Sequence, residues 1–108
     1  MKLNFNEVKR PSLDIVLNDE NKTELTLVTP AKYEVDKFLQ VFNKVVSMKA
    51  DDITNDDIYA LASTILSSNT KKIAVTAEEC ERIFTLYDVI LLLKTYNEFI
   101  LGLYNSKN

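Results

Sequence analysis

The fold of this chain is decided by one apolar stretch in its last third. Residues 76–104 read TAEECERIFTLYDVILLLKTYNEFILGLY. The first four residues match a capping box, in which the Thr76 hydroxyl accepts a hydrogen bond from the backbone N–H of Glu79 and the Glu79 carboxylate accepts one from that of Thr76. We therefore expect a single helix over about 77–104, the longest helix of the chain.

Two apolar stripes run along this expected helix and point well away from each other. The first consists of Cys80, Ile83, Phe84, Tyr87, Ile90 and Leu91, and the second of Leu86, Val89, Leu93, Tyr96, Ile100 and Leu103. A surface helix needs only one stripe, so this helix is buried on two sides. The favoured interpretation is a central core helix, and the alternative is a helix whose far end binds a partner. The candidate partner-binding residues are Tyr96, Phe99, Ile100, Leu103 and Tyr104.

An alternation of apolar and polar side chains precedes this stretch over residues 12–28. Apolar residues at every second position are typical of strands with one buried face. The polar segment 18–22 favours a turn, because Asn and Asp side chains hydrogen-bond the local backbone. The pattern predicts a β-hairpin over about 12–28. Two strands alone are marginal in water, so the hairpin must lie on helices or pair with strands of another chain.

The first residues of the chain show a weaker alternation. Leu3 and Phe5 fall on one side of an extended segment, which predicts either an edge strand or a loose N-terminal arm. Pro11 then ends any strand pairing, because proline has no backbone N–H to donate.

Two further helices are expected between the hairpin and the apolar stretch. Thr29 and Pro30 predict the start of a helix over about 30–48, with Thr as the cap and Pro in the first turn. Its apolar stripe consists of Val35, Phe38, Leu39, Phe42, Val45 and Val46. Thr54 or Asn55 caps a second helix over about 55–68. The buried face of this helix consists of Ile58, Leu61, Ala62, Ile65 and Leu66.

The length and composition indicate one domain, residues 1–108, with a single modest core. One Gly and two Pro in the chain argue against a sandwich or barrel, whose tight turns use both residue types. The predicted fold class is mainly α (α+β). It consists of an N-terminal β-hairpin followed by a three-helix bundle, with the long C-terminal helix at its centre.

The composition also narrows the function. A net charge of −3 without a basic stripe gives no reason to expect a nucleic-acid partner. The longest unbroken apolar run, residues 89–93, is far shorter than the roughly 20 residues that span a bilayer. The N-terminal residues lack the pattern of a secretory signal, so no membrane partner is expected. A single cysteine indicates a reducing compartment, and we expect a cytoplasmic protein.

The sequence offers little for catalysis or metal binding. It has no His, the commonest general base, and its single Cys is too few for a zinc site. Cys80 is either a reactive thiol near a helix start or, as we favour, a small apolar core residue. The acidic cluster at 51–57 lacks the spacing of a calcium loop and is more typical of helix capping. We therefore expect no catalytic residue, no metal site and no cofactor.

The order of the elements resembles that of one protein family. A short hairpin, LDIVL at 13–17 and ELTLV at 24–28, runs directly into Thr29-Pro30 and a helix. A late helix carries the run ILLLKTYNEFI at 90–100. In this order of elements the chain resembles the small tail assembly chaperones of long-tailed bacteriophages and related prophages.

The resemblance implies a role without catalysis during virion assembly, in the cytoplasm of the bacterial host. Proteins of this family bind the long tape measure protein and keep it soluble before tail-tube subunits polymerise around it, and some self-associate. The implied partners are thus a tape measure protein and, in a homo-oligomer, further copies of the chain. A tape measure protein is long, helical and apolar in patches, so its chaperone needs apolar surface that receives helices. The alternative function is a small regulatory or adaptor protein that binds a host or phage protein through its C-terminal helix.

Overall fold

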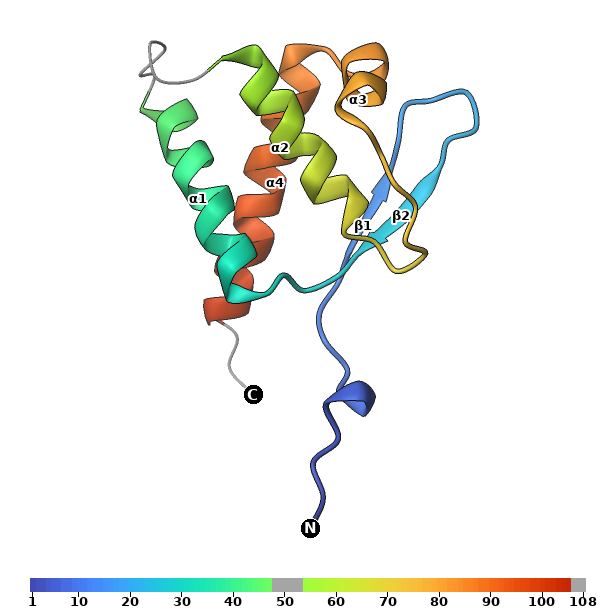
Figure 1. Cartoon of the computed structure of the whole chain (residues 1–108), viewed down its shortest axis with the longest axis vertical. Helices are drawn as coiled ribbons and strands as arrows, with labels where there is room; N and C mark the ends of the chain where they lie inside the picture. Colours follow the sequence, from blue (N-terminus) through green and yellow to red (C-terminus); the bar gives the residue numbers. More distant parts are fainter. Residues whose placement is uncertain (48–53, 106–108) are drawn as a thin grey trace.

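The computed structural model describes residues 1–47 and 54–105, and Figure 1 shows their arrangement. This part is mainly helical with an antiparallel hairpin near its N-terminus, as predicted. Its elements are η1 (Phe5–Glu7, a 3₁₀ turn), β1 (Leu13–Val16), β2 (Glu24–Leu27), α1 (Lys32–Val46), α2 (Asn55–Ser67), α3 (Ala77–Ile83) and α4 (Leu86–Asn105). The predicted number of helices is wrong, because the described residues form four α-helices where three were expected.

The predicted single helix over 77–104 is broken at Phe84 and Thr85. Phe84 has an extended backbone, with φ −113° and ψ 136°. Thr85 and Asp88 form a second capping box: the Asp88 backbone N–H donates to the Thr85 hydroxyl at 3.1 Å, and the Thr85 N–H donates to the Asp88 carboxylate at 2.9 Å. The sequence TLYD therefore starts α4 with a complete capping box. At the start of α3 only half of the predicted box forms: the Glu79 N–H donates to the Thr76 hydroxyl at 3.1 Å, but the Glu79 carboxylate accepts from that hydroxyl and not from the Thr76 N–H.

Two side chains from distant parts of the chain stabilise this break. Since α3 ends here, the backbone carbonyls of Ile83 and Phe84 need partners outside the helix. The Asn18 amide donates to the Ile83 carbonyl at 2.7 Å, and the Tyr59 hydroxyl donates to the Phe84 carbonyl at 3.0 Å. These hydrogen bonds offset the loss of helical ones and favour two helices over one.

Thr85→Ala removes the side-chain cap of α4. We expect the free energy of unfolding to fall by about 1 kcal/mol, the usual effect of losing an N-cap. Urea denaturation followed by circular dichroism measures the change. Thr70→Ala is the matched control, because Thr70 is exposed like Thr85 but lies in a loop. Equal urea midpoints for the two variants would contradict the capping role.

The predicted hairpin is confirmed, with Ile15 paired opposite Leu25. Leu25 and Leu27 are buried on the face that packs on the helices. Asp14 and Val16 are exposed on the opposite face. This alternation explains why the segment forms strands, since it gives the hairpin one apolar and one solvated face.

The outer edge of β2 is covered by the segment that follows α2. The Val28 N–H donates to the Ser68 carbonyl at 3.0 Å, and the Thr70 N–H donates to the Thr26 carbonyl at 2.9 Å. Asn69 lies between these contacts and is buried. Its side-chain amide makes two hydrogen bonds of 2.8 Å and one of 3.0 Å to the backbone around it. The hairpin is thereby joined to the end of α2.

The predicted helix start at Thr29-Pro30 is wrong, because Thr29 has another partner. Its hydroxyl donates to the Pro11 carbonyl at 2.5 Å. The helix α1 begins after Ala31 instead, and the Ala31 backbone N–H donates to the Glu34 carboxylate at 3.2 Å. Glu34 thus supplies half of a capping box in place of a threonine cap. The predicted end of this helix, residue 48, lies outside the described residues.

The second helix, α2, starts with the Thr54 cap that the sequence predicts. The Asp57 N–H donates to the Thr54 hydroxyl at 3.2 Å, and the Thr54 N–H donates to the Asp57 carboxylate at 3.0 Å. The hydrogen bond from the Thr54 N–H, with a smaller effect from the Thr54 hydroxyl, holds the pKa of the Asp57 carboxyl below its ordinary value. The five predicted core residues of α2 are all buried: Ile58, Leu61, Ala62, Ile65 and Leu66.

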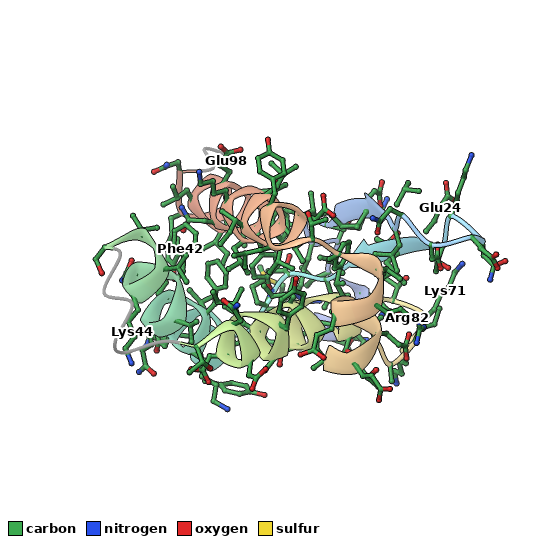
Figure 2. All side chains as sticks on the ribbon, turned by 90° about the horizontal axis from the view of Figure 1, so that it is seen from above. Glu24, Phe42, Lys44, Lys71, Arg82 and Glu98 are labelled. Atoms are coloured by element: carbon green, nitrogen blue, oxygen red, sulfur yellow. The ribbon has the colours of Figure 1, made fainter. Side chains whose placement is uncertain are left out.

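Side chains of α1, α2, α4 and the hairpin fill the interior (Figure 2). Phe38 stacks on Phe42 with ring centroids 5.2 Å apart, and it meets the ring of Tyr96 edge-on at 5.1 Å. Figure 2 shows Phe42 pointing inward from α1, with Lys44 on the outer side of α1 and Glu98 on the outer side of α4. The aromatic contacts therefore hold α1 against α4.

Candidate functional site

Two of the five predicted partner-binding residues belong to the core. Tyr96 is 4% exposed and Ile100 is 1% exposed. Burial, with a smaller effect from the charge of Glu34, raises the pKa of the Tyr96 hydroxyl to about 12. Placing these two side chains on a docking surface is therefore a wrong prediction. The stripe to which they belong faces inward, where Phe38 covers Tyr96.

The other three predicted partner-binding residues lie nearer the surface. Phe99 and Leu103 are half-buried, and Tyr104 is exposed. The Phe99 ring centroid is 6.1 Å from that of Tyr96, and Phe99 packs against the core. These residues do not form one continuous apolar surface with Tyr96 and Ile100, because the latter two are covered.

Cys80 is fully buried. Burial raises the pKa of its thiol to about 11, so the thiol stays protonated at neutral pH. This supports the interpretation of Cys80 as a small apolar core residue. Within residues 1–47 and 54–105, no three His, Cys, Asp or Glu side chains come together as a metal site requires.

One apolar groove lies between the hairpin and the last helix. This β1–α4 groove has a volume of about 260 Å³ and is lined by Ile15, Val16, Asn18, Phe84, Asp88, Leu91, Leu92 and Thr95. Val16 and Leu91 are its most exposed apolar side chains. The break before α4 shapes this groove, because the hydrogen bond from Asn18 to the Ile83 carbonyl brings the hairpin turn close to the start of α4.

A second apolar groove lies between the C-terminal half of α1 and the N-terminal half of α4. This α1–α4 groove has a volume of about 290 Å³ and is lined by Phe42, Val45, Val46, Ile90, Leu93 and Lys94. Val46 is exposed and Ile90 is half-buried. Among the described residues that line the groove, Lys94 supplies the one charge, which favours a partner with an acidic side chain at that position.

Two of the exposed apolar side chains in the first half of α4 come from the first predicted stripe, and one, Leu86, comes from the second. Tyr87 and Leu91 are exposed, whereas Val89 and Leu93 of the second stripe are buried. The sequence did indicate an exposed apolar surface, since it has two apolar stripes where one is enough for the core. It did not tell which stripe remains exposed, because that depends on where α1 and the hairpin pack.

Compared with known protein families, with curated proteins and with solved structures, the chain matches none. In the part of the chain that the structure describes, no helix combines the length and apolarity needed to cross a membrane. The two apolar grooves are the candidate binding sites of the described residues. Each groove combines accessible apolar side chains with one charged residue: Lys94 in the α1–α4 groove and Asp88 in the β1–α4 groove.

Proposed function

We propose that this protein is a non-enzymatic assembly chaperone that binds an apolar helix of its partner in the α1–α4 groove. We further propose that this partner is the tape measure protein of a long-tailed phage. The resemblance in the order of elements supports the choice of partner. The observation that carries the binding mode is the accessible pair Val46 and Ile90 between two helices, because such a groove accommodates a third helix.

The α1–α4 groove fits an amphipathic helix better than an extended peptide. Its walls are helices, and no strand edge lies among the described residues that line it. Apolar residues spaced three and four apart on the partner would cover Val46 and Ile90, and each Å² of apolar surface so buried contributes about 25 cal/mol. Lys94 is exposed beside them and would pair with a carboxylate of the partner. A tape measure helix held in this way is kept from aggregating with its neighbours.

Co-expression with a tape measure protein of a long-tailed phage tests this proposal. We expect soluble tape measure protein to co-purify with the wild-type chain. For Val46→Glu we expect recovery to fall by at least about tenfold, because a carboxylate would then face the apolar side of the bound helix. Val28→Glu is the matched control, since Val28 is an exposed valine that lines neither groove.

Two results would overturn different parts of the proposal. Equal recovery with Val46→Glu and Val28→Glu would exclude the α1–α4 groove as the binding site. Failure of the wild-type chain to retain the tape measure protein would exclude that partner. Recovery of a regulatory protein in its place would favour the adaptor alternative.

A further inference from the structure

We infer that two copies of this chain exchange their first residues, each segment adding as an antiparallel strand to the outer edge of β1 in the other copy. Residues 1–10 form this N-terminal arm. The added strand would cover the β1–α4 groove. Since the proposed chaperone function uses the α1–α4 groove, the two proposals can fail separately.

The outer edge of β1 has no strand beside it within residues 1–47 and 54–105. The backbone N–H of Leu17 donates to the Thr23 carbonyl at 2.8 Å. The odd-numbered residues of β1 therefore direct their backbone N–H and C=O groups toward β2. Asp14 and Val16 consequently direct theirs outward, and together they offer two N–H and two C=O groups. An edge of this kind receives a further strand readily.

The β1–α4 groove gives an added strand an apolar surface to pack on. Phe84, Leu91 and Leu92 line the groove beyond the edge of β1. Leu91 is 53% exposed. Alternate side chains of a strand paired with β1 would point into this groove, and they would remove Leu91 from water.

The N-terminal arm carries the apolar side chains that such a strand needs. Leu3 is 69% exposed and Phe5 is 66% exposed, and residues two apart lie on the same face of a strand. The turn η1 buries no residue and is capped locally, by a 3.0 Å hydrogen bond from the Asn6 N–H to the Asn4 side chain. Figure 1 shows the arm extending away from the helices. Unwinding η1 breaks exposed hydrogen bonds within the arm, among them one from the Arg10 guanidinium to the Phe5 carbonyl at 3.1 Å. It uncovers no core residue, and pairing would bury two large apolar side chains.

Charge complementarity favours the same pairing. The charged side chains of the arm are Lys2, Glu7, Lys9 and Arg10, so cations outnumber carboxylates there. The charged side chains of β1 and of the β1–α4 groove are Asp14 and Asp88, and no Lys or Arg belongs to the described residues that line them. The net charge of the arm is thus opposite in sign to that of the edge and the groove.

A second copy supplies the arm more easily than the chain itself does. The chain's own arm leads into β1 and points away from it (Figure 1). Folding back would require a reversal around Pro11, whose carbonyl accepts a hydrogen bond from Thr29. Two copies related by a two-fold axis can each place an arm on the β1 of the other, which covers both edges and closes the assembly as a dimer.

Sedimentation equilibrium tests the exchange with the full chain and its variants. We expect the wild-type chain to be a dimer and the variant lacking residues 1–8 to be a folded monomer, because these residues contribute nothing to the core. Leu91→Asp should also be monomeric, whereas Leu101→Asp, on a residue that is 50% exposed but outside the groove, should remain dimeric. Val46→Glu should remain dimeric as well. A monomeric wild-type chain, or a dimer that survives loss of the arm, would overturn the inference.

Paired cysteines identify which copy supplies the arm. With Phe5 opposite Ile15, Leu3 lies opposite Leu17, and the apolar side chains share one face. Phe5→Cys combined with Ile15→Cys should then give a covalent dimer after oxidation, because directly opposed positions bring Cβ atoms within disulfide range. Cys80 does not compete, since it is fully buried. A bond within one chain, or no bond, overturns the arm exchange.

Discussion

Ile100→Asp is expected to prevent the domain from folding at room temperature. Ile100 is almost fully buried in the core. An aspartate at this position would place a carboxyl group among apolar side chains without a hydrogen-bond partner, which costs several kcal/mol even after the pKa rises and the group becomes neutral. Loss of the isoleucine packing adds about 2–5 kcal/mol. The sum is comparable to the whole stability of a small domain, about 5–15 kcal/mol.

Leu101→Asp is the control for this prediction, one residue along the same helix. Because Leu101 is half exposed, an aspartate there stays hydrated, and we expect a change within about 1 kcal/mol. Circular dichroism and thermal unfolding compare the two variants. If Ile100→Asp unfolded at the temperature of the wild-type chain, Ile100 would be a surface residue after all. The far end of α4 would then become a candidate docking surface again.

Phe38→Ala is expected to lower the free energy of unfolding by about 3–5 kcal/mol. Phe38 is buried between Phe42, on which it stacks, and Tyr96, which it meets edge-on. Its removal leaves a cavity between α1 and α4 and also removes both aromatic contacts. Guanidinium denaturation monitored by circular dichroism measures the loss.

Tyr33→Ala on the same helix is the matched control for Phe38→Ala. Tyr33 is exposed, and its ring contacts the Lys37 ammonium group at 5.9 Å. We expect its loss to change the free energy of unfolding by less than about 1 kcal/mol. Similar losses for the two variants would contradict the placement of Phe38 at the centre of the core.

Local sequence patterns predicted the elements whose stabilising contacts are themselves local. The hairpin follows from its alternation, and the start of α2 follows from Thr54 and Asp57, which are only three residues apart. The break between α3 and α4 was missed although TLYD has the form of a capping box. A capping box inside an apolar stretch does not by itself show that the helix is interrupted there. Side chains from distant segments, Asn18 and Tyr59, also stabilise the break.

The candidate site was less predictable than the fold for the same reason. Two stripes over residues 80–103 indicated more apolar surface than a single helix face needs, but which of these side chains stay exposed depends on long-range packing. Tyr96 is buried because Phe38 of α1 lies against it, and no feature of residues 76–104 records that contact. Thr29 failed as a helix cap in the same way, since its hydroxyl bonds to Pro11, which is 18 residues earlier.

The extended backbone at Phe84 has a consequence for the dimensions of the molecule. A straight helix over 77–104 would measure about 42 Å at 1.5 Å per residue. The described residues extend 52, 34 and 19 Å along their principal axes, so such a rod would exceed the two shorter dimensions. Continued straight, the first two turns could not turn back over α2 as α3 does, with Cys80 buried in the core. Bending the chain there lets α3 lie across α2, so a short polypeptide encloses more of its apolar surface.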